Sequence, residues 1–362
     1  MNYFGLFPKY KVNRYLSERE VRHRLAQKQR LNVEPRFQLC VIKMNSTFLE
    51  SVDKWYGWRG SLLLFLIPAT AIPVWMMGSM ISIAFSKSGG WPLLPYDVEI
   101  ILMIAPIAAS TFLAGIWILL RDCFTFTHYP MRFNRKKRVV HVFHTDGTVS
   151  TTPWDEIFFT LGHMKGLHEW EVRGHILEPN TSTIRRTFAL SYTGPLNSND
   201  IDPGVSGPSE YDFIRSHWEF IRRYMEDGPE AVAGQVQFCM PLDGRRESIR
   251  VGTERVFANF ASVPFVIYLV AWPLCALTSL FRIFAMRTSK IPVWPDDVEK
   301  DCLIEVDDPY AIVGDEIGDR VAVYPEAAAA AGVEFREAVE EERNLRSRNG
   351  TVKVTKHGDN LL

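Results

Sequence analysis

The stretch SLLLFLIPATAIPVWMMGSMISIAF, residues Ser61–Phe85, decides how this chain is organised. It lies within a longer run without charge, between Arg59 and Lys87. A bilayer core of about 30 Å needs about 20 apolar residues in a helix, so the stretch predicts a membrane-spanning helix. Pro68 and Pro73 would end a helix in water, but transmembrane helices tolerate proline.

A second charge-free run, IILMIAPIAASTFLAGIWILL at 100–120, follows a short link rich in glycine and proline. The two runs predict a helical hairpin over 61–120 that crosses the membrane twice. The alternative is a pair of buried helices in a water-soluble protein, but runs of this length leave no polar face for solvent. Aromatic rings near the ends of such runs favour the headgroup layer. The predicted interface anchors are Trp55, Trp58, Trp91 and Tyr96.

Basic residues set the predicted orientation. The first 60 residues carry twelve Lys or Arg against five acids, and the link carries only Lys87. A basic cluster follows the second run at Arg132, Arg135, Lys136, Lys137 and Arg138. The positive-inside rule therefore places the N-terminal region and the residues after 120 in the cytoplasm. Because MNYFGLFPKYK lacks a signal-peptide core, we expect the first helix to act as an uncleaved insertion signal.

The basic cluster at 132–138 has two interpretations. Nucleic-acid binding is one, but the net charge of −1, from 41 basic and 42 acidic residues, does not favour it. Contact with lipid headgroups and control of topology are simpler, because the cluster lies about a dozen residues from the membrane. We therefore predict a lipid bilayer as a partner and no nucleic acid.

A third apolar run, VFANFASVPFVIYLVAWPLCALTSLF at 256–281, is long enough to cross a membrane. Basic residues precede it and follow it, which does not favour a single crossing. Pro264 and Pro273 allow a re-entrant or surface-lying element instead, and a buried helix is the third alternative. A single crossing would place the C-terminal tail on the outer side.

Residues 121–230 predict a cytoplasmic β-rich domain closed by one helix. Asp146-Gly147 between two β-prone runs is a strong hairpin signal. After a loop at 194–209, the helix 209–227 presents one apolar face, formed by Ile214, Trp218, Ile221 and Met225. Either a small split barrel, as in pleckstrin-homology-like domains, or a sheet with one covering helix satisfies this pattern. The predicted strands are 124–128, 138–143, 148–152, 156–161, 169–177 and 185–192.

The remaining segments complete an α+β membrane protein. Residues 1–60 form a basic cytoplasmic region with a helix at 17–30, where Ser17 and Glu20 fit a capping box. Residues 231–255 are a predicted linker. The tail, 282–362, is acidic, with seventeen Asp or Glu against eight Lys or Arg from Ile291 onward, and includes a predicted helix at 326–348.

No residue pattern predicts catalysis, a cofactor or a metal site. The five cysteines lack CxxC spacing and read as free thiols. Walker A, GxGxxG, GxSxG and HExxH patterns are absent. Trp154 reads as a core anchor, with Asp155 and Glu156 on the rim rather than as paired catalytic acids. The three apolar runs hold no ionisable residue of the kind that a pump or proton relay needs.

The order of these segments resembles a family of uncharacterised proteobacterial membrane proteins, a domain of unknown function, over roughly residues 50–310. The most telling segments are Met131–Phe143, Pro153–Glu156 and Ile291–Cys302. Members resemble proteins often encoded beside type VI secretion effectors. The resemblance implies a multi-pass protein of the bacterial inner membrane and carries over no catalytic residue.

We therefore expect a non-enzymatic accessory or immunity protein that binds a protein partner, a secreted effector or secretion component, through its β-rich domain. The alternatives are a membrane-bound sensor or regulator that binds lipid headgroups, and an unrecognised membrane enzyme.

Overall fold

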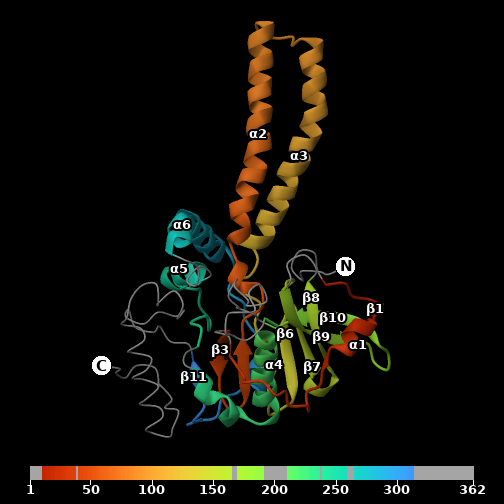
Figure 1. Cartoon of the computed structure of the whole chain (residues 1–362), viewed down its shortest axis with the longest axis vertical. Coiled ribbons are helices and arrows are strands. Elements are labelled where there is room, and N and C mark those ends of the chain that lie inside the picture. The colour runs from red at the N-terminus through yellow and green to blue at the C-terminus, as the bar shows by residue number, and fades with distance from the viewer. Residues whose placement is uncertain are drawn as a thin grey trace, which may run out of the picture. The chain divides into compact units, whose positions relative to one another are not determined.

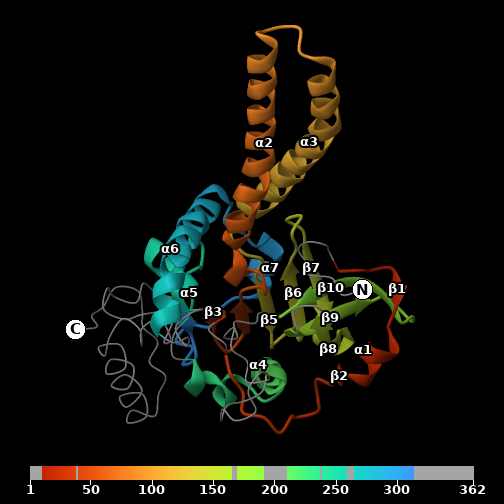
Figure 2. The same ribbon diagram turned by 45° about the horizontal axis from the view of Figure 1, so that its top comes forward.

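A computed structural model describes residues 10–37, 40–164, 169–190, 210–236, 239–258 and 265–313. The chain divides into two compact units (Figures 1 and 2). The β-rich unit combines residues 1–57, 128–271 and 291–362, and the helical unit combines 58–127 and 272–290. The β-rich unit therefore draws on sequence from both sides of the hairpin. The predicted helix at 326–348 lies outside the described residues.

The first sheet of the β-rich unit has five described antiparallel strands in the order β1-β10-β9-β8-β2. Its three long strands confirm the predicted strands at 156–161, 169–177 and 185–192, with shifted ends for the first and last. The bounds are β1 Arg14–Tyr15, β2 Arg24–Leu25, β8 Phe158–Met164, β9 Glu169–Leu177 and β10 Thr183–Ala189.

The second sheet has six described antiparallel strands in the order β11-β3-β4-β5-β6-β7. The hairpin at Asp146-Gly147 is confirmed, and Gly147 adopts φ +81°, which glycine accepts without steric cost. The bounds are β3 Val41–Met44, β4 Phe48–Ser51, β5 Met131–Asn134, β6 Val139–Phe143, β7 Val149–Pro153 and β11 Ile312–Val313.

Neither sheet closes on itself, so the split-barrel alternative is wrong. The first sheet ends in the two-residue strands β1 and β2, and the second ends in β11 and β7. The strand predicted at 124–128 is also wrong, because only an isolated bridge from Phe126 to Lys290 forms there. No strand is predicted before residue 61, yet β1 to β4 all join these sheets.

The covering helix is confirmed as α4, Glu210–Glu226. Its predicted apolar face is buried, with Trp218 and Ile221 fully enclosed. The indole of Trp154 stacks on Trp218 with ring centroids 5.6 Å apart, and its Nε1 donates to Glu226 Oε1 at 2.7 Å. Trp154 is therefore a core anchor, as predicted, while Asp155 next to it is exposed.

The N-terminal helix is shorter than predicted. The capping box of Ser17 and Glu20 forms, but α1 covers only Glu18–Arg22. Leu25, three residues on, belongs to β2 and is buried opposite Phe159. The helix ends before Leu25 because strand pairing with β8 buries the Leu25 side chain in the sheet.

In the helical unit, α2 (Ser61–Ser88) and α3 (Pro95–Cys123) form the predicted hairpin. They pack closely at Gly115, where an added Cβ would lie 2.0 Å from Cγ2 of Thr70. The third apolar helix, α6, spans Phe265–Thr288 and continues through Pro273. Among the described residues, three helices are long and apolar enough to cross a membrane: Ser61–Ser88, Pro95–Cys123 and Leu269–Thr288.

Buried charges connect the ends of these three helices. Arg59, Asp122 and Arg282 are each at most 2 % exposed. Arg59 Nη1 lies 3.4 Å from Asp122 Oδ1, and Arg282 Nη1 donates to the carbonyl of Arg59 at 3.4 Å. The C-terminal part of α6 is therefore fixed to the start of α2 and the end of α3, which form the end of the hairpin opposite the link.

Short helices complete the described chain, and two of them, η4 and α5, lie wholly or mostly in the predicted linker at 231–255. These are η1 Tyr56–Trp58, η2 Trp154–Glu156, η3 Pro229–Ala231, η4 Ala233–Gln235, α5 Ile249–Ala258 and α7 Asp296–Asp301.

Candidate binding pocket of the β-rich unit

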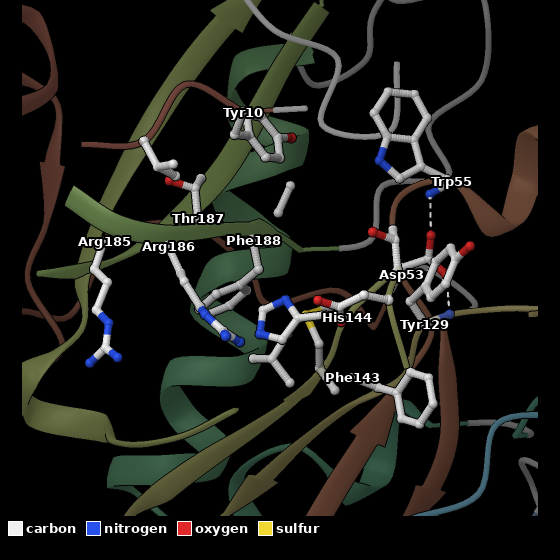
Figure 3. Close-up of a pocket in the computed structure, with 16 residues that line it drawn as sticks. Tyr10, Asp53, Trp55, Tyr129, Phe143, His144, Arg185, Arg186, Thr187 and Phe188 are labelled. Atoms are coloured by element: carbon white, nitrogen blue, oxygen red, sulfur yellow. Dashed lines mark hydrogen bonds between the residues drawn. The ribbon is translucent and has the colours of Figure 1, made fainter. Parts of the chain in front are cut away.

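A pocket of about 330 Å³ opens between the two sheets of the β-rich unit (Figure 3). One side comes from β10, the other from the end of β6 with its hairpin turn, and the back from the segment after β4. The lining residues are Tyr10, Val12, Asp53, Trp55, Tyr129, Met131, Val142, Phe143, His144, Thr145, Asp146, Arg185, Arg186, Thr187, Phe188 and Ala189.

Asp53 holds the back of the pocket together. Its carboxylate accepts hydrogen bonds from the backbone N–H groups of Trp55 and Tyr129, both at 2.8 Å, as Figure 3 shows. Asp53 also bridges to Leu190 at the end of β10. Because both carboxylate oxygens already accept backbone hydrogen bonds, Asp53 positions the walls and does not act as a free acid.

The aromatic wall is fixed from behind by buried charge. The Tyr10 hydroxyl donates to Glu171 Oε2 at 3.0 Å, and Lys54 Nζ lies 2.6 Å from the same oxygen. Arg173 pairs with the other oxygen of Glu171 and lies over the Tyr10 ring at 5.2 Å. Burial opposes ionisation of Glu171, but Lys54 and Arg173 outweigh it and hold its pKa below the ordinary value.

Two arginines form the rim on β10. In Figure 3 the side chains of Arg185, Arg186 and Phe188 extend to one side of the strand and that of Thr187 to the other. The register with β9 shifts between Ile184 and Arg186, so a bulge places consecutive arginines at one opening. No described residue forms a hydrogen bond or ion pair with the Arg185 guanidinium.

The opposite rim carries His144 and Asp146. His144 Nε2 lies 2.7 Å from Ser150 Oγ. Hydrogen bonds from Thr148 lower the pKa of Asp146, with smaller contributions from the charges of His144 and Arg186. The pocket therefore combines an aromatic interior with a rim in which cations predominate, a combination suited to an acidic segment with an apolar side chain.

The predicted basic cluster lies elsewhere, mostly in ion pairs. Arg132 is buried between the rings of Phe48 and Trp294, and its Nε lies 2.7 Å from Glu50 Oε2. Exposed Lys136 and Lys137 pair with Glu305 and Asp301 of the same unit, and half-buried Arg138 pairs with Asp155 and Glu226. Arg135, the fifth member, forms no ion pair with an acid in the described part of the chain. Headgroup contact by this cluster stays a prediction.

The predicted interface anchors fall into different surroundings. Trp55 lines the pocket, with Lys54 Nζ 5.0 Å from its ring centroid. Trp58, Trp91 and Tyr96 belong to the helical unit and are 46 %, 75 % and 70 % exposed. The three exposed rings suit a headgroup layer, whereas the pocket gives Trp55 a second possible use.

The other side chains that could bind a metal or act as catalysts lie apart from one another. All five cysteines are free and buried, and burial raises the pKa of Cys40. Among the described residues, no group of three or more His, Cys, Asp or Glu is placed to hold a metal ion. His141 and His175 are buried on separate strands, hydrogen-bonded to Thr151 and Thr187. Asp155 pairs with Arg138, so it is not a free catalytic acid.

No sequence pattern marks the pocket. Tyr10, Asp53, His144 and Arg186 are far apart in sequence and meet only because the sheets bring them together. The one local signal is Arg185-Arg186 inside a predicted strand, where alternation would place the two side chains on opposite faces. The bulge that overrides alternation has no marker, such as glycine, in this sequence.

No curated protein and no solved structure matches the chain. A family model matches residues 108–305, more than half of the chain. The matched range includes β5 to β10, α4 and all of α6, and thus one wall of the pocket with both rim arginines. The chain belongs to this family of unknown function, DUF6708.

Proposed function

We propose that this chain is a non-enzymatic membrane protein whose β-rich unit binds a protein partner at the pocket. The observation that carries the proposal is the composition of that pocket, in which Tyr10, Trp55 and Tyr129 line the interior and Arg185 and Arg186 the rim. Tyr, Trp and Arg are the side chains enriched at the energetic centres of protein interfaces. A partner segment that presents a carboxylate beside an apolar side chain fits this arrangement.

The location we propose is a bacterial inner membrane, with the N-terminal region in the cytoplasm. The hairpin of α2 and α3 supports membrane insertion, and the excess of basic residues before residue 60 supports the orientation. The resemblance to proteins encoded beside type VI effectors supports the more specific role, an accessory or immunity protein whose partner is a secreted effector or secretion component.

The headgroup-binding alternative depended on the basic cluster at 132–138. Four of its five side chains pair with acids of the β-rich unit, which leaves little free charge for lipid. The enzyme alternative has less support, because the candidate acids Asp53 and Asp155 are held by hydrogen bonds or ion pairs.

The test combines co-purification with protection. The full chain is expressed in membranes together with the product of the neighbouring gene, and complex formation and resistance to the toxin are measured. The double variant Arg185→Glu, Arg186→Glu should weaken the complex roughly 30-fold or more, since interface arginines at hot spots contribute above about 2 kcal/mol. Arg22→Glu on α1, an exposed arginine away from the pocket, is the matched control.

Binding and protection that survive the double variant would contradict use of the pocket. Failure of the unaltered chain to bind or protect would contradict the partner assignment. Vesicle binding that the same double variant abolishes would favour the headgroup-binding regulator.

A further inference from the structure

The segments on either side of α6 pack on the same strand of the β-rich unit. On the N-terminal side, the N–H of Met240 donates to the carbonyl of Val41 at 2.6 Å, and Asp243 lies 2.6 Å from Lys43 Nζ. On the C-terminal side, β11 pairs with β3, with Ile312 opposite Met44. Both flanks of α6 are therefore held by β3.

Further contacts make each attachment firm. Before α6, the hydroxyl of Tyr56 donates to Glu247, and an added Cβ on Gly57 would lie 2.6 Å from Arg255. After α6, the indole of Trp294 donates to Glu50 Oε1 at 3.0 Å, and Asp308 accepts from Ser46 N at 2.7 Å.

Chain length excludes a hidden return crossing. Only six residues, 259–264, separate α5 from α6. Fully extended, they reach about 20 Å, less than the roughly 30 Å bilayer core, and an extended backbone in lipid would leave its polar groups unsatisfied. A single crossing by α6 would thus separate two flanks that contact the same strand.

The surface of α6 still requires an apolar environment. Its exposed side chains are almost all apolar, with Val266, Val270 and Leu280 exposed by 71 %, 74 % and 62 %. A third of its span is buried inside the protein, against 6 % and 11 % for the two hairpin helices. Exposed Arg287 and Lys290 follow at its end, where anionic headgroups favour basic side chains.

We propose that α6 does not cross the membrane but lies in the interfacial layer of the bilayer, on the side that holds the β-rich unit. The C-terminal end of α6 is fixed to the end of α3 on that side of the bilayer. Thr288 and Ser289 donate to the carbonyl of Cys123, and Phe284 packs on Phe124. The protein then has two crossings, and the segment 291–313 shares a side with the N-terminal region. The inference rests on the hairpin spanning the bilayer.

Cysteine labelling of the full chain in spheroplasts tests the inference. Tyr15→Cys, Trp91→Cys and Val306→Cys place single exposed thiols before the hairpin, in its link and after α6, at sites 73 %, 75 % and 91 % exposed. The native cysteines are buried, and the unaltered chain measures their background. A membrane-impermeant maleimide is applied before and after permeabilisation.

We expect Val306→Cys and Tyr15→Cys to react only after permeabilisation, and Trp91→Cys to react before it. Val306→Cys reacting together with Trp91→Cys, apart from Tyr15→Cys, would overturn the inference and establish three crossings. Trp91→Cys reacting together with Tyr15→Cys would overturn the hairpin premise, and with it the membrane arrangement of the proposed function.

Depth measurements distinguish a surface-lying helix from a deep one. Spin labels at Val270→Cys, Leu277→Cys and Leu280→Cys in reconstituted full-length protein should all show shallow immersion by oxygen and nickel relaxation. Val74→Cys, near the middle of α2, is the deep reference. A depth maximum at Leu277→Cys equal to that of Val74→Cys would overturn the interfacial placement.

Discussion

Single residues in the β-rich unit divide into those that fill its core and those that neutralise buried charge. Trp154 belongs to the first group, since it contacts Trp218, Phe133 and Phe159 while its indole nitrogen reaches Glu226. Arg132 and Glu50 belong to the second, since neither is exposed by more than 4 %. The two groups respond differently to substitution.

Trp154→Ala should destabilise the β-rich unit by about 3–5 kcal/mol, because it removes a fully buried ring and leaves a cavity. Trp154→Phe should cost less, since a ring remains against Trp218. The measurement is the unfolding transition of the full chain in detergent. An effect of Trp154→Ala no larger than that of the exposed neighbour Glu156→Ala would contradict the core role.

Arg132→Gln should cost about 3–5 kcal/mol, because it leaves Glu50 buried without its charge partner. Lys137→Gln, whose side chain is 52 % exposed in its pair with Asp301, should change stability by less than about 1 kcal/mol. Urea unfolding of the two variants checks the contrast. Equal costs would contradict the separation of this cluster into a buried and a surface part.

His217 should make stability depend on pH. It is fully buried beside Cys40 and Phe220, and burial lowers its pKa to about 4. The unfolded imidazole takes a proton near pH 6.5 while the folded one does not. The contribution of His217 to the free energy of unfolding is therefore fully present above about pH 6.5. It is lost as pH falls toward 4, by up to roughly 3 kcal/mol.

His217→Gln removes that titration and should flatten the stability profile between pH 6.5 and 4.5. Thermal unfolding across this range measures the slope in both proteins. Burial also lowers the pKa of His175, so a residual slope of the same sign should remain. A variant profile as steep as the original would contradict this role of His217.

At the scale of elements, the sequence predicted what depends on local pattern. The hairpin helices, the Asp146-Gly147 turn and the apolar face of α4 follow from periodicity and turn chemistry. The short strands β1, β2 and β11 do not, because two-residue strands carry no periodic signal and form only where a longer strand offers its edge. The bulge that aims Arg185 and Arg186 into one opening is equally nonlocal.

The segment 291–313 is such a nonlocal element, and Trp294 attaches it to the second sheet. Trp294→Ala should release the segment, because Trp294 is buried against Phe143 and Arg132 and donates to Glu50. Limited proteolysis should then cleave the chain near 291–313 at least several-fold faster. The neighbouring variant Val293→Ala, at a side chain 77 % exposed, should not change the rate. Equal rates would contradict the attachment.

At the scale of the whole molecule, the net charge of −1 is a cancellation. Basic residues concentrate before the hairpin and acids concentrate after Ile291, and some of these acids pair with basic residues that follow the hairpin, as Asp301 does with Lys137. The β-rich unit combines sequence that precedes the hairpin with sequence that follows it. We propose that its pocket is the surface that binds a protein partner.

Photo-crosslinking from the pocket tests the partner account most directly. A photoreactive phenylalanine replaces Thr145 at the rim, and a control replaces Val21 on α1, away from the pocket. With the full chain in membranes and the product of the neighbouring gene co-expressed, we predict a crosslink from position 145 that the Arg185→Glu, Arg186→Glu variant abolishes, and none from position 21. Crosslinks of equal yield from both positions, or none from position 145 while the two proteins co-purify, would contradict binding at the pocket.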